Sequence, residues 1–326
     1  MLDILYRIIA KLLTIIFDKP LPPPSSTELK MVDELKNRFQ ELPDIQVENM
    51  PPSQAEWADN MHQLRQLVLN DNPRRFLRWH VVMSTMFVTH PAYIHSELKF
   101  LKKQPDWNSK WRQAIKESAY GHPLPYPFYP SSSGNLIHNA YHLSQFEQLI
   151  HLPVEDMAIV LEFGGGYGSM CRLFHQLGFK GIYVIIDLPP FSALQRYFLK
   201  SSGISVQEIQ AAGPPANGVF CVSEPDDLRG VLSRHFHKNK AMFISTWAIS
   251  ETPMHIRQSF MPFINMFDYY LIAYQHRFEE MDNIRYFTDW QKLFDNQMIW
   301  HDYEIKHLPG SSYLMGKRLM PDTRYS

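Results

Sequence analysis

The chain has 326 residues, and its 32 basic and 33 acidic side chains give a formal charge of −1. With 45% hydrophobic and 20% charged residues it is globular in composition, which excludes a disordered or fibrous protein. The near-neutral charge argues against a nucleic-acid-binding protein, which needs a basic face for phosphates. Two cysteines, Cys171 and Cys221, exclude a disulfide framework and a four-thiolate zinc site. We therefore expect a reduced, cytoplasmic setting.

The first segment, residues 1–17 (MLDILYRIIAKLLTIIF), predicts an amphipathic helix. Asp3, Arg7 and Lys11 recur every four residues and form one charged stripe on an otherwise apolar surface. The segment is too short and too charged to span a bilayer, and no small-residue cleavage site follows it. The helix can pack on its own domain, pack on a second subunit, or lie on the inner face of a membrane. These alternatives stay open.

Proline-rich stretches divide the chain into three predicted parts. Residues 1–20 carry the amphipathic helix, and residues 21–130 form a helical N-terminal or cap region that begins with the linker LPPPSS. The loop GHPLPYPFYP, residues 121–130, marks the boundary with a third part, residues 131–326. Tyr126, Phe128 and Tyr129 in this loop can form an aromatic platform for a ring-shaped ligand or can simply pack between domains.

After residue 131 the chain alternates between short apolar runs and amphipathic helices. Strands are expected at residues 158–163, 181–187, 218–222, 241–246, 269–274 and 312–315, and a helix near residues 135–150 precedes the first of them. This alternation predicts an α/β fold with a mostly parallel, doubly wound sheet.

The most specific motif follows the first predicted strand. Glycines at 164, 166 and 168 permit a strand-to-helix turn with positive φ and a close approach of backbone to ligand. A dinucleotide fingerprint requires a further glycine at 169, where this chain has Ser169. The second strand ends in Asp187, a carboxylate that can accept hydrogen bonds from ribose hydroxyls. The pattern therefore fits an adenosyl ligand without pyrophosphate.

These residues resemble a known family. Residues 162–168 and Asp187 are similar to motif I and the ribose-binding acid of class I S-adenosylmethionine-dependent methyltransferases. Residues 161–199, 135–147 and 243–253 resemble the bacterial sugar O-methyltransferases. The resemblance implies a Rossmann-like, seven-stranded, mostly parallel sheet with a helical N-terminal region. It also implies S-adenosylmethionine as cofactor and methyl transfer to a hydroxyl, on a sugar or a precursor in polysaccharide biosynthesis.

The same resemblance assigns the cofactor residues. The methionine part of the cofactor would be bordered by the acid and glycines of the motif, namely Glu162, Gly164, Gly165, Gly166 and Gly168. Asp187 would hold the ribose, and Leu188 would lie near the adenine. Glu224 is a further candidate for the adenine edge, with an exposed loop acid as the alternative.

The general base is not given by the resemblance. Plant-type O-methyltransferases share Asp-Leu-Pro at residues 187–189 but carry His-Asp-Trp where this chain has Ser245-Thr246-Trp247. Their catalytic histidine is therefore missing here. Glu251 is the first substitute, with stabilisation of the next helix N-terminus as its alternative role. His255 and His138 are the other catalytic candidates.

Polar and aromatic residues near the expected strand ends are candidates for binding the acceptor, because amide and guanidinium donors suit sugar hydroxyls. His138 and His142 lie one helical turn apart, but the pair lacks the central glutamate of a metalloprotease motif and an evident third ligand, so no metal is expected. Surface solvation or core packing is the alternative for each candidate. The substrate-binding candidates are Trp247, Gln275, Arg277, Asn283 and His142.

Three other functions remain open. The same fold can methylate another small molecule, such as an amine or a phenol. A nicotinamide-dependent oxidoreductase is disfavoured by Ser169 and by the lack of an obvious Tyr-x-x-x-Lys pair. A non-catalytic protein of this fold would act through partner binding, which the intact cofactor motif argues against. The expected partner is a small-molecule or glycan hydroxyl acceptor, a homo-oligomer is also open, and no nucleic acid is expected.

Overall fold

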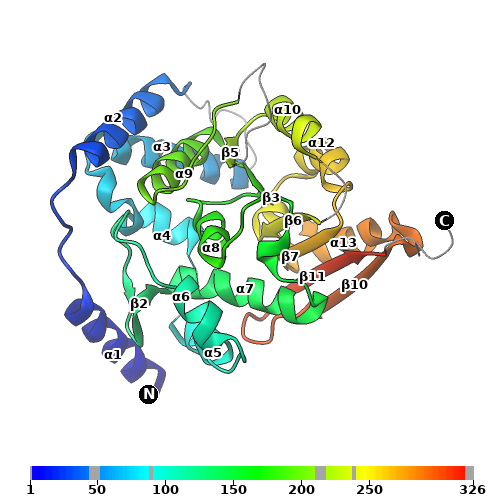
Figure 1. Cartoon of the computed structure of the whole chain (residues 1–326), viewed down its shortest axis with the longest axis horizontal. Helices are drawn as coiled ribbons and strands as arrows, with labels where there is room; N and C mark the ends of the chain where they lie inside the picture. Colours follow the sequence, from blue (N-terminus) through cyan, green and yellow to red (C-terminus); the bar gives the residue numbers. More distant parts are fainter. Residues whose placement is uncertain (1, 44–51, 88–90, 210–217, 237–239, 320–326) are drawn as a thin grey trace. The chain divides into compact units, whose positions relative to one another are not determined.

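The computed structural model describes residues 2–43, 52–87, 91–209, 218–236 and 240–319 (Figure 1). The chain divides into two compact units. The first comprises Met1–Ser144, Gly165–Gly178 and Asp187–Gln207, and the second comprises Gln145–Gly164, Phe179–Ile186 and Glu208–Ser326. The three-part division predicted from the sequence, with boundaries after residues 20 and 130, stays a prediction.

The second unit is built on a seven-stranded sheet. In spatial order its strands are Met298–Glu304 (β10), Ser311–Arg318 (β11), Tyr269–Gln275 (β7), Ala241–Thr246 (β6), Ile159–Phe163 (β3), Ile182–Ile186 (β4) and Val219–Val222 (β5). Neighbouring strands from β7 to β5 are parallel, and β11 is antiparallel to both β7 and β10. The predicted mostly parallel seven-stranded sheet is confirmed.

All six strands predicted from apolar runs are present, and β10 is the strand that the sequence did not reveal. β10 lies at the edge of the sheet, and most of its side chains are partly buried or exposed, so that no buried apolar run marks it. The two short hairpins also escaped prediction. They pair Pro125–Tyr126 (β1) with Tyr129–Ser133 (β2), and Arg277–Phe278 (β8) with Met281–Asp282 (β9).

The strand order reverses between β3 and β6. From β3 the chain moves outward through β4 to β5, then returns to the other side of β3 to form β6 and β7. This reversal is a topological switch point, and open α/β sheets bind ligands outside the carboxyl ends of the strands at such a point. Phe163 and the residues after Ser245 stand at that position.

One face of the sheet is covered by helices of the same unit. Pro225–His235 (α10), Met254–Ile264 (α12) and Asn283–Lys292 (α13) contribute apolar side chains to a core with Ile159, Leu161 and Phe163 of β3. Alternate residues of a strand point to opposite faces, so Glu162 lies on the other side of the sheet. The short helix Ala248–Glu251 (α11) follows β6 directly.

The first unit is mainly helical, as predicted for the N-terminal region. Its helices are Leu2–Phe17 (α1), Ser26–Glu41 (α2), Pro52–Asn70 (α3), His80–Met86 (α4), Pro91–Leu101 (α5), Arg112–Ala114 (α6), Ser169–Leu177 (α8) and Pro189–Ser201 (α9), with most of Gly134–Ile150 (α7). Helix α9 packs against α2 and α3 (Figure 1). Shorter helical turns cover Pro73–Arg78 and Trp107–Trp111 in this unit, and Val154–Asp156 and Asp295–Gln297 in the second unit.

The structure forms a helix over the segment predicted to be amphipathic, Leu2–Phe17. The side chains of the predicted charged stripe, Asp3, Arg7 and Lys11, lie outside those that the structure describes. The exposed apolar side chains of helix α1 include Ile9, Leu12, Ile15, Ile16 and Phe17. Among the described residues, no helix is both long enough and apolar enough to cross a bilayer.

Candidate cofactor and acceptor site

The glycine turn after β3 adopts the backbone conformation that its sequence predicts. Gly164, Gly166 and Gly168 have φ values of +76°, +55° and +94°. L-residues with side chains rarely adopt such values, whereas glycine does so without steric cost. Gly168 is the N-cap of α8. The three glycines therefore let the chain leave the sheet and enter the helix in a tight turn.

Gly164 is required by contact as well as by conformation. A Cβ atom at this position would lie 2.1 Å from the Cβ of Ala248, in the turn after β6. The Ser245 hydroxyl donates a hydrogen bond to the Phe163 carbonyl at 3.1 Å, which ties the ends of β3 and β6 together. The chain is therefore tightly closed at the switch point of the sheet, and only a residue without a side chain fits there.

Asp187 and the second half of the glycine turn lie together in the first unit. The backbone N–H of Gly166 donates to Asp187 Oδ2 at 3.0 Å, and the N–H of Leu188 donates to Oδ1 at 2.8 Å. Burial raises the pKa of Asp187 to about 7, while hydrogen bonds from Leu188, Gly166 and other donors act in the opposite direction. The turn and the acid, although 21 residues apart in the sequence, are thus in direct contact.

Gln195 completes this contact, and the sequence analysis missed it. Its side-chain amide donates to Asp187 Oδ2 and to the Gly166 carbonyl, both at 2.9 Å. The side chain is fully buried, and its Oε1 atom has no hydrogen-bond partner among the described residues. The signal was present in the sequence: Gln195 is a polar residue on the same helical face as Phe191 and Leu199.

Glu162 is nearly inaccessible, with 3% exposure. Its Oε2 atom accepts a hydrogen bond from the Tyr183 hydroxyl at 2.9 Å, within the second unit. Leu188 is exposed at the start of α9, and Glu224 is an exposed residue at the N-cap of α10. Leu188 thus offers an apolar surface beside Asp187. Glu224 is exposed, as the alternative interpretation of this residue expected.

Trp247 occupies a strained backbone position after β6. Its φ and ψ of +65° and −39° are unusual for a residue with a side chain, and its N–H donates to the Ala273 carbonyl at 2.7 Å. Such strain often occurs at functional sites. Glu251 ends α11 and is partly buried, and His255 is exposed in the first turn of α12. These three residues stay candidates.

Asn283 has a structural environment that the sequence did not indicate. It is fully buried at the start of α13, where its amide donates to the carbonyls of Ser250 and Gln275 at 3.0 and 2.9 Å. Its Oδ1 atom accepts from Arg257 at 2.9 Å. The amide of Asn283 therefore joins three segments of the second unit, which is a structural role. The expected contact between Asn283 and the acceptor stays a prediction. Gln275 is partly buried and Arg277 is exposed.

His138 and His142 form a buried chain of hydrogen bonds with Glu97 of α5. His138 Nδ1 lies 2.7 Å from Glu97 Oε1, and the Nε2 atoms of the two histidines lie 3.0 Å apart. A carboxylate only accepts, so a neutral His138 donates from Nδ1 and accepts at Nε2 from His142. Both ring nitrogens of His138 are therefore engaged. Glu97 is the partner that the sequence analysis missed. The sequence did carry a sign of this role, because Glu97 is an acidic residue between the core residues Ile94 and Leu101.

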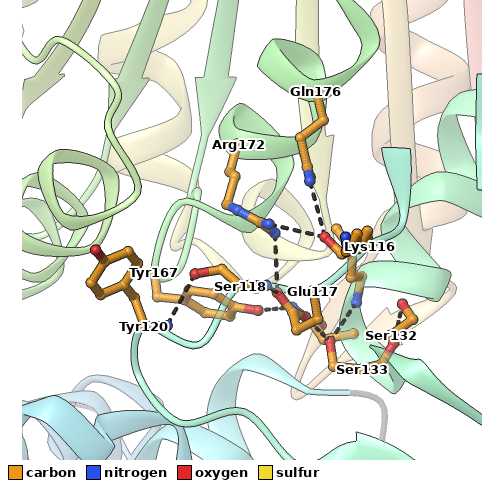
Figure 2. Close-up of polar contacts among 11 residues, drawn as sticks. Lys116, Glu117, Ser118, Tyr120, Ser132, Ser133, Tyr167, Arg172 and Gln176 are labelled. Atoms are coloured by element: carbon orange, nitrogen blue, oxygen red, sulfur yellow. Dashed lines mark hydrogen bonds and ion pairs between the residues drawn. The ribbon is translucent and has the colours of Figure 1, made fainter. Parts of the chain in front are cut away.

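A polar network supports the turn from the segment before α7. Arg172 of α8 donates to Glu117 Oε1 and to the Lys116 carbonyl, each at 3.0 Å (Figure 2). The Ser133 hydroxyl bonds to the other oxygen of Glu117 and accepts the Leu136 N–H at the start of α7.

Tyr167, between two of the glycines, extends this network. Its hydroxyl accepts a hydrogen bond from Asn135 at 3.0 Å, and its ring stacks on Phe87. Burial raises the pKa of this phenol, so it stays protonated at physiological pH. The turn is therefore held by both polar and aromatic contacts of the first unit.

The aromatic residues of the proline-rich loop pack within the first unit. Tyr126 is buried against Phe128 with ring centroids 5.8 Å apart, and Tyr129 lies beside Trp107 and under the Lys102 ammonium. Within the described residues, no group of three or more His, Cys, Asp or Glu side chains is arranged to hold a metal ion.

Strand order, the single reversed strand, the glycine turn after β3 and the carboxylate after β4 together define the class I methyltransferase fold. No protein-family model matches the chain, and no curated protein matches it in sequence.

Several solved structures match the chain at low similarity. They include PigF with S-adenosylhomocysteine (SAH), at 11% identity over 91% of this chain and 100% of that chain, with a TM-score of 0.37. The mitomycin 7-O-methyltransferase MmcR has 10% identity over 89% and 95%, with a TM-score of 0.34. The SAH-bound methyltransferase PaMTH1 from Podospora anserina has 8% identity over 73% and 92%, with a TM-score of 0.36. Because these TM-scores are low, the fold assignment rests on the sheet and its turn.

Proposed function

We propose that the protein transfers a methyl group from S-adenosylmethionine to a hydroxyl group of a sugar or glycan precursor. The observation that carries the proposal is the contact between Asp187 and Gly166. It joins a carboxylate able to accept from ribose to a glycine turn that lets a ligand approach the backbone. Neither feature alone is specific, but along the chain the turn directly follows β3 and the acid directly follows β4, two strands of a sheet with methyltransferase strand order.

The residues present fit an adenosyl cofactor. Asp187 would accept from the ribose, the exposed Leu188 side chain would cover the adenine, and the backbone of the glycine turn would border the methionine part. Glu162 lies two residues before Gly164, near the end of β3. Its carboxylate would attract the ammonium group of the cofactor. When bound, the sulfonium supplies an activated methyl group for attack by an acceptor oxygen.

The chain must align the acceptor oxygen and remove its proton. Glu251 is the first proposed base, because it follows the end of β6 at the sheet's switch point. The second is the histidine pair, which has the Glu97 carboxylate as its orienting group. In either case the carboxylate or imidazole accepts the hydroxyl proton as the oxygen attacks.

The sugar assignment comes from the sequence resemblance, and polar groups after β7 support it. Gln275 and Arg277 carry planar amide and guanidinium donors that suit vicinal hydroxyls. Trp247 adds an aromatic face of the kind on which sugar rings stack. An amine or phenol acceptor would use the same cofactor residues and differ only in these contacts.

The proposal is tested by measuring SAH release from S-adenosylmethionine with sugar nucleotides, glycans, phenols and amines as acceptors. We expect turnover with a sugar hydroxyl, and at least a 100-fold lower kcat in Glu251→Gln if Glu251 is the base, since general base catalysis contributes about 10²–10⁴-fold. Normal turnover in Glu251→Gln with loss in His138→Gln would assign the base to the histidine pair. Turnover only with amines or phenols would contradict the sugar acceptor.

A further inference from the structure

The three glycines of the turn differ in what lies against their α-carbons. A Cβ atom at Gly164 would lie 2.1 Å from the Cβ of Ala248, and one at Gly168 would lie 3.2 Å from a fully buried leucine side chain. Neither position leaves room for a further atom. At Gly166 the nearest atoms belong to Met86, the last residue of α4, whose side chain is partly exposed.

Met86 lies along Gly166 over most of the length of its side chain. Its Sδ, Cγ and Cβ atoms lie 3.5, 3.6 and 3.8 Å from the position that a Cβ atom of Gly166 would take. The N–H of Gly166 donates to Asp187, and its carbonyl accepts from Gln195. With both polar groups of Gly166 engaged, its α-carbon is the side that remains, and Met86 faces that side.

The packing of α4 holds Met86 at this place within the first unit. Val81 and Val82 near the start of the helix are buried. Phe87, directly after Met86, stacks on the ring of the turn residue Tyr167, with ring centroids 5.7 Å apart and an interplanar angle of 12°. Met86 is thus a flexible, unbranched side chain on a fixed backbone, and its thioether can adapt to a neighbouring ligand.

We propose that Met86 is a binding residue for the methionine part of the cofactor, with its thioether packed against the methylene groups next to the cofactor sulfur. The inference rests on the proposed S-adenosylmethionine cofactor, whose methionine part would border the glycine turn. A partly exposed apolar side chain beside Gly166 would cover these methylene groups from water. Because Asp187 would hold the ribose, Met86 and Asp187 would bind different parts of the same molecule.

Calorimetric titration with SAH and with 5′-methylthioadenosine tests this division, because the second ligand keeps the adenosine and the sulfur but lacks the amino-acid chain. In Met86→Ala, SAH should bind about 4–15-fold more weakly, since each methylene group kept out of water is worth about a factor of four. The affinity for 5′-methylthioadenosine should stay within about twofold of the wild-type value, because this ligand lacks the methylene groups that Met86 would cover.

A merely structural role of Met86 gives a different pattern. Loss of the side chain would then shift the turn and with it Asp187, and both ligands would lose affinity by the same factor. That result, unchanged binding of both ligands, or tighter binding of SAH by Met86→Ala would overturn the proposal. Failure of the wild-type protein to bind SAH at all would overturn the proposed cofactor, and the inference with it.

Oxidation of the wild-type protein gives a second measurement that needs no variant. Dilute hydrogen peroxide converts thioethers to sulfoxides, and mass spectrometry of the peptides gives the rate at each methionine. Met31 of α2 is the internal control, a partly exposed methionine whose sulfur accepts from Ser201.

With saturating SAH, the oxidation rate at Met86 relative to that at Met31 should fall at least about threefold, because a thioether covered by ligand is less accessible. An unchanged ratio would contradict the proposal. This result decides the question even if Met86→Ala does not fold or the shorter ligand binds too weakly to measure.

Discussion

Gly164 shows how the absence of a side chain shapes the carboxyl end of β3. The residue has positive φ, and a Cβ atom would overlap Ala248. Ala248 belongs to α11, which follows the strand on the other side of the switch point. The close approach of these two segments therefore depends on a single glycine.

We predict that Gly164→Ala destabilises the fold by about 3 kcal/mol or more, because backbone strain and overpacking add. Gly178→Ala is the matched control, since Gly178 also has positive φ but faces open space. It should cost only about 1 kcal/mol. Urea denaturation of both variants measures the difference, and equal losses would show that the contact with Ala248 does not matter.

We predict that Asp187 makes cofactor binding pH-dependent. With its pKa raised to about 7, the acid is largely protonated at pH 6 and largely ionised at pH 8. The ionised form accepts hydrogen bonds from ribose, so we predict that SAH affinity rises about tenfold from pH 6 to pH 8. Titrations across this range measure the effect, with Asp187→Asn as the variant that should lose it. A flat profile in the wild type would contradict a titrating ribose acid.

The pH dependence of folding stability has the opposite sign to that of cofactor affinity. The pKa of Asp187 is higher in the folded protein than its ordinary value of 3.8. A raised carboxyl pKa contributes stability when the group is protonated, and this contribution is lost as the pH rises from about 4 to about 7. With rising pH the ligand-free protein should therefore lose stability, mainly between about pH 4 and pH 7, whereas its affinity for SAH should rise.

At the scale of elements, Arg257 connects α12 with the start of α13. Its guanidinium is fully buried and donates to the carbonyls of Thr252 and Ser250 at 2.6 and 2.8 Å, and to Asn283 at 2.9 Å. Burial lowers its pKa to about 10, so it remains charged at neutral pH. One side chain thus joins three segments behind the carboxyl ends of β6 and β7.

We predict that Arg257→Met lowers the free energy of unfolding by about 3 kcal/mol or more, because it leaves buried acceptors without donors. Arg285→Met on α13 is the control, since that side chain is highly exposed and its ion pair with Asp289 is worth little. Thermal or urea unfolding distinguishes the two. Similar stability of both variants would mean that water replaces the guanidinium.

Helix α1 offers a second element-scale test. We propose that its exposed apolar side chains, among them Leu12 and Ile16, rest on an anionic membrane surface. Sedimentation with anionic liposomes should then recover the wild-type protein but not Leu12→Glu/Ile16→Glu, and neutral liposomes should bind less. Equal recovery of both proteins, or of neither, would leave packing on protein as the role of the helix.

The elements also show how far the sequence predicts the structure. Strands with apolar runs were found because both of their faces are covered. β10 was missed because it lies at the sheet edge and mixes buried, partly buried and exposed positions without a regular pattern. Gln195 and Glu97 were missed for a related reason. Each is a single polar residue on an apolar helical face, and its importance depends on a partner far away in sequence: Gly166 for Gln195, His138 for Glu97.

At the scale of the molecule, the glycine turn was predictable because its conformation is a local property of glycine. The family resemblance implied only that the turn and Asp187 border the same cofactor, and the structure adds a direct hydrogen bond between them. Asn283 shows the limit: its amide looks available in the sequence and is occupied in the structure. Composition and spacing predict helices, strands and turns, but they do not predict which polar groups form hydrogen bonds with one another.

We infer that this fold binds an adenosyl cofactor through Asp187 and the glycine turn. The most direct test is calorimetric titration of the purified protein with SAH and with NADH, compared with Asp187→Asn. We predict micromolar binding of SAH, a loss of at least about tenfold in Asp187→Asn, and no binding of NADH. A folded wild-type protein that does not bind SAH, or that binds NADH tightly, would contradict the account.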